Sequence, residues 1–297
     1  MLALTLPAFV LSVACGLALA AADYFRKVVP ASVPTATVLF YFLAVQIPLL
    51  GAGLIFAPPA AVPGAAYWAP ALADAAFSLT GNALFIVSVR RSPLTMVVPL
   101  LSFIPIITIA LGALLLGEQP ALHQGLGVGL AAIGVMLLYL PPGSARIGDI
   151  WRTFRAEPGA LPMIGVALAW SMTAPLDKIA VAQAGVALHG AILLTLVCTG
   201  IAAWLVFSRD GSFRVPREGR AVILWAGLAA GLSFALQLAA YSLTLVAFVE
   251  ALKRVAEIGV TVAIGVLLFR EAHGAAKIAG LALILCGVPL MLVPASG

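Results

Sequence analysis

The sequence predicts an all-α membrane protein of ten transmembrane helices, arranged as two inverted five-helix repeats. Three observations lead to this fold class. The 297 residues are 63% hydrophobic and only 9% charged, whereas soluble domains carry about 25% charged residues. The apolar residues fall into ten segments long enough to span a membrane, and the basic residues between them gather almost entirely on one side. The third observation is an internal similarity between the two halves of the chain.

The ten segments are separated by charges, by clusters of proline and glycine, and by polar loops. Each is close to the roughly 20 apolar residues that span a bilayer. The longest loops, 142–159 and 208–220, are polar and too short for a soluble domain. Short connections after residues 116, 243 and 269 predict hairpin neighbours. The expected helices cover residues 7–27, 34–56, 66–89, 93–116, 121–141, 160–180, 187–207, 221–243, 245–269 and 275–294.

The first segment contains an apolar stretch and an Ala-Leu-Ala sequence that resemble a signal peptide. A signal peptide has a basic region before its apolar stretch. No Lys or Arg precedes this stretch, and the apolar run extends to about Val29. We therefore expect this segment to be retained as the first membrane helix.

Loop charge predicts the orientation of the chain. If the N-terminal side is called side A, only Lys178 lies on it, and all other loop Lys and Arg residues lie on side B. Short basic loops stay in the cytoplasm, so we expect side B to be cytoplasmic and both termini to lie outside, in an inner membrane. The side B residues are Arg26, Lys27, Arg90, Arg91, Arg146, Arg152, Arg155, Arg209, Arg214, Arg217, Arg220, Arg270 and Lys277.

The two halves resemble each other at a near-constant offset. "ALAAADYFRKVV" in the first segment is similar to "ALAWSMTAPLDKIAV" in the sixth, and "ITIALGALLLGEQP" is similar to "VTVAIGVLLFREAHG". These alignments predict two repeats, residues 1–145 and 155–297. Because five helices are an odd number, the second repeat enters the membrane from the opposite side. Inverted repeats of this kind are found in many secondary transporters, with the substrate near the midplane.

Several classes of function lack their motifs. No P-loop, GxSxG or HExxH motif is present, so we expect neither direct use of ATP nor an enzyme. The three cysteines, Cys15, Cys198 and Cys286, lie apart in apolar runs and predict no disulfide, metal site or cofactor. The net charge of +5 is spread over short loops, which does not indicate nucleic-acid binding.

Four charged residues lie in the ninth apolar segment: Glu250, Lys253, Arg254 and Glu257. Lys253 and Arg254 are roughly 12–14 Å from the helix start at 1.5 Å per residue, near the midplane. Such charges normally face a cavity or a partner. Two interpretations stay open: ion pairs at i, i+4 spacing (Glu250 with Arg254, Lys253 with Glu257), or a site that binds a substrate.

Further polar residues within apolar segments are candidates for the same substrate site. Asp74 is expected at a similar depth, where it would pair with a helix-nine cation, exchange protons or fix the packing of helices. Asn82 lies close to the same face of that helix. The remaining substrate-site candidates are Trp170, Gln237 and Tyr241.

A second set of charges is predicted at the ends of the first and sixth segments. Asp23 and Lys27 lie at the side B end, and Asp177 and Lys178 at the side A end. They suit a pair of gates, or else anchor helix ends at the membrane interface. Glu118 and Glu271 are expected to be loop or capping residues.

The order and spacing of these motifs resemble the drug/metabolite transporter superfamily, EamA type. The resemblance rests on "LLLGEQP", "LLFREAHG" and the acid–lysine helix ends, and it covers nearly the whole chain. It implies a ten-helix permease around a central cavity that closes by alternating access. Many members are thought to keep their termini in the cytoplasm, unlike the orientation predicted here. The adjacent Lys253 and Arg254 also resemble the phosphate-binding pair of plastid sugar-phosphate translocators.

The sequence therefore predicts a secondary transporter for a small polar metabolite, either an amino acid or an organic anion. Transport would be coupled to protons or to exchange. We expect the partners to be this substrate and the lipid bilayer, and the chain to be a monomer or weak homodimer. Two alternatives stay open: a flippase or carrier for a lipid-linked or phosphorylated sugar, and a membrane scaffold that does not transport.

Overall fold

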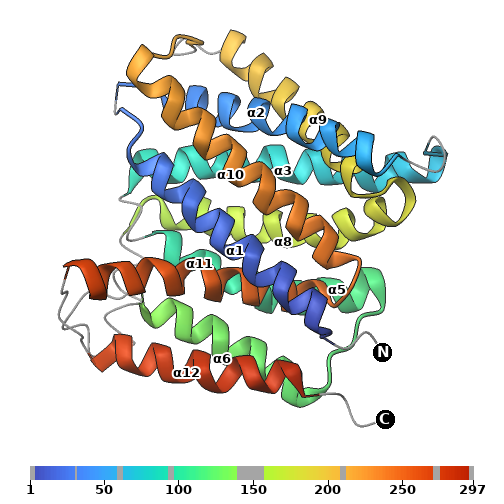
Figure 1. Ribbon diagram of the computed structural model, residues 1–297, viewed down its shortest axis with the longest axis vertical. Helices are drawn as coiled ribbons and strands as arrows, with labels where there is room; N and C mark the ends of the chain where they lie inside the picture. The colour runs from blue at the N-terminus through green and yellow to red at the C-terminus, as the bar shows by residue number, and fades with distance from the viewer. Residues whose placement is uncertain are drawn as a thin grey trace.

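The computed structural model describes residues 4–30, 32–58, 63–92, 97–138, 157–207, 212–269 and 275–293. Within these residues the chain forms ten α-helices and one 3₁₀-helix, with no strand. The helices are α1 (Leu6–Lys27), α2 (Thr35–Phe56), α3 (Ala65–Arg91), η1 (Val98–Phe103), α5 (Ile104–Leu116), α6 (Leu122–Leu138), α8 (Ala160–Ala184), α9 (Val186–Phe207), α10 (Arg217–Tyr241), α11 (Val246–Phe269) and α12 (Ala275–Leu292). Figure 1 shows both termini on the same side of the molecule.

The helix expected over 93–116 is interrupted at two of its prolines. The expected helix over 93–116 is a 3₁₀-helix followed by α5, and residues 93–96 lie outside the described part of the chain. Pro99 and Pro105 each lack the N–H that an α-helix needs for its i→i−4 hydrogen bond. The helix consequently begins afresh at Ile104.

Glycine ends the helices that bring the polar residues together. Gly117 follows α5 with a φ of 66°, and Gly185 follows α8 with a φ of 77°. This left-handed conformation suits a residue without a Cβ. The turn at Gly117 brings Glu118 back beneath α5, where its N–H donates to the carbonyl of Gly112 at 3.1 Å.

The helices stack along the long axis of the molecule, with the α2–α9 pair toward one end and the α6–α12 pair at the other (Figure 1). Helix α1 packs on α10 and α11, while α8 packs on α3 and α5. If the two halves of the chain are aligned, α1 corresponds to α8, α10 to α3, and α11 to α5. The two sets of contacts then correspond to each other.

Small residues allow close approach where helices cross. A Cβ added to Gly16 of α1 would lie 2.3 Å from the backbone oxygen of Lys253 in α11. Between α6 and α12, Gly127 faces the backbone of Gly287 and Gly134 faces that of Gly280. Small residues at such crossings are typical of membrane helices.

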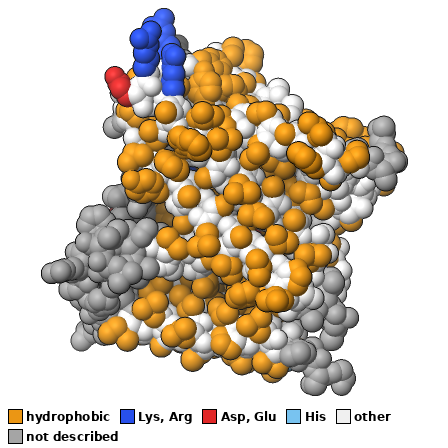
Figure 2. Space-filling model, in the orientation of Figure 1, with side chains coloured by type: hydrophobic (Ala, Val, Ile, Leu, Met, Phe, Trp, Pro, Cys, Tyr) orange, Lys and Arg blue, Asp and Glu red, His pale blue; other side chains and the backbone are white. Residues whose placement is uncertain are grey.

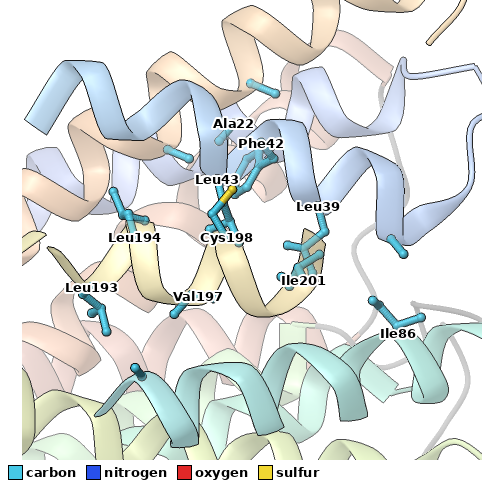
Figure 3. Packing of buried hydrophobic residues seen from close by; sticks show 14 of the residues in the cluster. Ala22, Leu39, Phe42, Leu43, Ile86, Leu193, Leu194, Val197, Cys198 and Ile201 are labelled. Carbon is cyan, nitrogen blue, oxygen red and sulfur yellow. The ribbon is translucent and has the colours of Figure 1, made fainter. Parts of the chain in front are cut away.

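An apolar core lies between α1, α2, α3, α9 and α10. Figure 3 shows Phe42 and Leu43 of α2 on the side of α9 that carries Cys198, whereas Val197 points from the opposite side of α9. Leu193, Ile201 and Leu205 extend this packing along α9.

The outer surface is apolar as well. Figure 2 shows hydrophobic side chains over most of one face, with the visible charges gathered at one end, over the start of α10. Ile55, Leu114 and Leu285 are each more than 70% exposed. Seven of the described helical stretches are long and apolar enough to cross a membrane. A water-exposed surface of this kind would be unfavourable, whereas lipid solvates it well.

Candidate functional site

The four charges of α11 form two close ion pairs. Lys253 Nζ lies 2.6 Å from Glu250 Oε1, and Arg254 Nη1 lies 2.9 Å from Glu257 Oε2. Both pairs have i, i+3 spacing, so the i, i+4 pairs expected from sequence are not the close contacts. Their side chains are 4–11% exposed. The four charges sum to zero, which allows them to remain ionised inside an apolar protein.

Two residues of α10 contact the ion pair of Lys253 and Glu250. Gln237 accepts a hydrogen bond from Lys253 Nζ at 2.7 Å, and Tyr241 donates one to Glu250 Oε1 at 2.5 Å. We call Gln237, Tyr241, Glu250 and Lys253 the α10–α11 cluster. The structure thus brings four of the predicted substrate-site residues into direct contact.

Helix α1 packs on α11 beside the other ion pair. A Cβ added to Gly16 would lie 3.1 Å from the backbone nitrogen of Glu257. Asp23 pairs with Arg26 at 3.0 Å rather than standing alone at the helix end. The side chain of Lys27, the other predicted gate residue here, lies outside the described residues, as does Glu271.

Asp74 lies in a different group from the α11 charges. Its carboxyl faces His189 Nε2 at 3.5 Å, and Asp177 lies 3.0 Å from the same nitrogen. The predicted pairing of Asp74 with Lys253 or Arg254 is therefore not present among the described ion pairs. Tyr67 completes the group, with its hydroxyl 3.1 Å from His189 Nδ1.

His189 is the residue that sequence reasoning missed. His189 lies in a different helix from Asp74 and from Asp177, and no sequence motif connects the three. Its only sequence signal is a polar residue inside an apolar helix. All three side chains are at most 2% exposed.

The adjacent predicted gate residues Asp177 and Lys178 point to different partners. Because α8 continues to Ala184, Asp177 lies inside the helix and is buried rather than at its end. Lys178 Nζ lies 2.5 Å from Glu118 Oε1 and 2.6 Å from the carbonyl of Thr244. Glu118 also accepts the N–H of Val246, the first residue of α11, at 3.0 Å, so its side chain caps the start of a helix distant in sequence.

Two further candidates lie where α3 meets α8. Trp170 stacks on Phe85 with ring centroids 5.8 Å apart. Its indole covers Gly81, where an added Cβ would lie 2.5 Å from Nε1. Asn82, the next residue, is half-buried. This pair is thus separate from the α10–α11 cluster in its described contacts.

The two described cavities lie away from these charges. One, of about 640 Å³, lies between α2, α10 and the turn at Gly185. The other, of about 1000 Å³, lies between the start of α2 and residues 212–224. Neither is lined by Lys253 or Asp74. The central cavity implied by the family resemblance stays a prediction.

Apolar spans, a lipid-compatible surface and buried ion pairs together define a multi-pass membrane protein. Residues 6–140 match the EamA-like transporter family. The match covers a little less than half of the chain, and it supports the predicted membership of the drug/metabolite transporter superfamily. No curated protein matches the chain. A crystal structure of a protein superposes with a TM-score of 0.74 over 95% of each chain, at 14% sequence identity, and so shares the fold.

Proposed function

We propose that this protein is a secondary active transporter that binds a small zwitterionic metabolite, such as an amino acid, at the α10–α11 cluster. The observation that carries the proposal is the buried, charge-neutral contact between Lys253 and Glu250, held by Gln237 and Tyr241 of another helix. Membrane-buried charges of this kind commonly mark substrate pathways.

The charge balance favours a zwitterion over a phosphate. A phosphate would bring about two negative charges to a site where each described cation already has a carboxylate partner. A zwitterion adds no net charge, and it can exchange each internal contact for an equivalent one. Its carboxylate would replace Glu250 on Lys253, and its ammonium group would replace Lys253 on Glu250.

Alternating access is proposed from the relation between the two halves. Exchange of the halves maps the α1 contacts onto the α8 contacts, which supports inverted repeats over 1–145 and 155–297. The Lys178–Glu118 pair then joins the second repeat to the first near the turn between α10 and α11. In this proposal it closes the side of the membrane on which the termini lie.

Binding can be tested by thermal stability of the purified protein with amino acids, organic anions and sugar phosphates. A ligand at 100 times its Kd stabilises by about 2.7 kcal/mol, and we expect an amino acid to do so. Glu250→Gln and Lys253→Gln should both weaken this ligand at least tenfold. Arg90→Gln, at an exposed helix end, is the matched control and should bind normally.

The two variants also separate the ligand classes. An anionic ligand should bind no worse to Glu250→Gln, because that variant removes a competing carboxylate. Stabilisation by sugar phosphates that survives or increases in Glu250→Gln would contradict the zwitterion and favour the phosphorylated-sugar alternative. Stabilisation that is equal in all three variants would place the binding site elsewhere.

We also propose an inner-membrane location with both termini outside the cytoplasm, from the excess of basic residues in side B loops. A C-terminal fusion to alkaline phosphatase, which is active only outside the cytoplasm, should then be active. The same fusion to a fluorescent protein that folds only inside should be dark. The opposite pair of results would reverse the orientation.

A further inference from the structure

A second polar group is buried apart from the α10–α11 cluster. Asp74 of α3, Asp177 of α8 and His189 of α9 form what we call the Asp–Asp–His trio. One carboxylate oxygen of each acid and one ring nitrogen of the histidine all lie within 4.8 Å of one another. Each residue is at most 1% exposed, as is Tyr67, whose hydroxyl contacts the histidine. Three helices from both halves of the chain therefore meet at one buried polar point.

The trio contains two acidic residues and one basic residue, so its charges do not cancel when all three are ionised. With His189 protonated and both acids ionised, its net charge is −1. Among the described residues, no Lys or Arg forms an ion pair with either acid. Lys178, the neighbour of Asp177 in sequence, forms its ion pair with Glu118. An unbalanced charge in an apolar interior is costly, so a further positive charge is needed.

One atom of the trio lacks a hydrogen bond. Asp74 Oδ2 is fully buried and has no hydrogen-bond partner among the described residues. Among the described hydrogen bonds, the other oxygen, Oδ1, accepts one long contact of 3.5 Å from Ser78. One carboxylate oxygen of Asp74 and one of Asp177 lie within 4.8 Å of each other. A proton held between them would satisfy Oδ2 and make the trio neutral.

We propose that the trio is a proton-binding site that couples transport to a proton gradient. One proton binds between the Asp74 and Asp177 carboxyls, and it leaves as a proton when the site reaches the opposite side of the membrane. No other bond forms or breaks. The coupling rests on the proposed transport function, whereas the binding of the proton does not.

The structure offers a route from the trio to the rest of the molecule. Asp177 precedes Lys178 on α8, and Lys178 holds both Glu118 and the carbonyl of Thr244. Tyr241, the partner of Glu250, packs in one buried cluster with Ala174 and Val181 of α8. A change of charge at Asp177 would therefore act on a helix that contacts both Glu118 and the α10–α11 cluster. Among the described residues, Tyr67 also faces the trio, through its hydroxyl group on His189 Nδ1.

The same three residues form a possible ligand set for a metal ion, but the geometry favours a proton. His189 Nε2 lies 3.0 Å from Asp177 Oδ1, a normal hydrogen-bond length. When Nε2 carries the proton of this bond, it has no lone pair for a metal. Zinc in structural sites usually takes four protein ligands. Among the described residues, this group offers three.

Infrared spectroscopy of the purified protein in lipid tests proton binding without any substrate. At neutral pH the wild type should show the C=O band of a buried protonated carboxyl, and the band should disappear in Asp74→Asn and in Asp177→Asn. Glu218→Gln removes an exposed carboxyl of α10 and should leave the band unchanged. A wild-type spectrum without the band, or loss of the band on addition of stoichiometric zinc with tight zinc binding, would overturn the proposal.

Coupling is tested in vesicles with a mixture of radiolabelled amino acids. For one proton per substrate, a pH difference of one unit supports about tenfold accumulation. Acid outside should drive it for symport, and acid inside for antiport. Asp74→Asn should abolish this accumulation but retain exchange of labelled for unlabelled amino acid. Gradient-driven accumulation that persists in Asp74→Asn would overturn the coupling. A wild type that moves no amino acid at all would refute the proposed function and the coupling, while the infrared result would still decide proton binding.

Discussion

Replacement of Lys178 by methionine is expected to lower the free energy of unfolding by about 3–5 kcal/mol, the cost of removing one partner from a buried ion pair. The side chain is 15% exposed and its partner Glu118 is 8% exposed. Its loss leaves the Glu118 carboxylate without a cation and the Thr244 carbonyl without its donor. Helix α8 is thereby released from the ends of α5 and α10.

Further variants test whether the loss of stability comes from the ion pair itself or from any Lys or Arg to Met substitution. Glu118→Gln keeps an acceptor for the Val246 N–H and removes the charge, so the Lys178→Met/Glu118→Gln double variant should be more stable than the sum of the two single losses predicts. Arg90→Met is the surface control and should change stability by less than 0.5 kcal/mol in magnitude, roughly the usual range for surface sites. Denaturant unfolding in micelles measures all four. Strictly additive losses would mean that Lys178 and Glu118 do not interact.

Replacement of Gly16 by alanine is expected to have the next largest effect. The added Cβ would lie 2.3 Å from the Lys253 carbonyl oxygen and 2.7 Å from Ala256 Cβ. A backbone oxygen cannot rotate away as a side chain does, so α1 and α11 must separate. Overpacking of this kind typically costs about 1–3 kcal/mol. The melting temperature in detergent should fall accordingly, and binding at the neighbouring α10–α11 cluster should weaken with it.

Gly51→Ala provides the matched control for this prediction. Gly51 also lies within a membrane helix, but nothing is within 4 Å of the position of its added Cβ. Alanine is favoured over glycine in a helix by up to about 1 kcal/mol, so this variant should be as stable as the wild type or more so. A Gly16→Ala protein that is as stable as Gly51→Ala would show that α1 and α11 do not approach so closely.

The helices were predictable because apolar length is a strong local signal. The segments expected over 34–56 and 187–207 agree closely with α2 and α9. The predicted sixth segment ends at 180, shortly after Asp177 and Lys178, whereas α8 ends at Ala184. In the structure, partners from other helices satisfy both charges, and α8 continues for another turn.

The partners of the buried charges were harder to predict, because they depend on tertiary contacts. Both i, i+3 and i, i+4 neighbours are close on a helix, and Gln237 and Tyr241 of α10 select Glu250 as the partner of Lys253. The meeting of Asp74, Asp177 and His189 depends on how α3, α8 and α9 pack. Nothing in the local sequence around His189 carries that information.

The central claim, transport of a zwitterion through the α10–α11 cluster, is tested most directly by counterflow in reconstituted vesicles. Vesicles loaded with unlabelled amino acids are diluted into a trace of the labelled mixture, and the label inside is followed with time. We expect a transient accumulation above equilibrium with the wild type and with Arg90→Gln, and none with Lys253→Gln. Label in wild-type vesicles that never exceeds that in protein-free vesicles would contradict transport of amino acids.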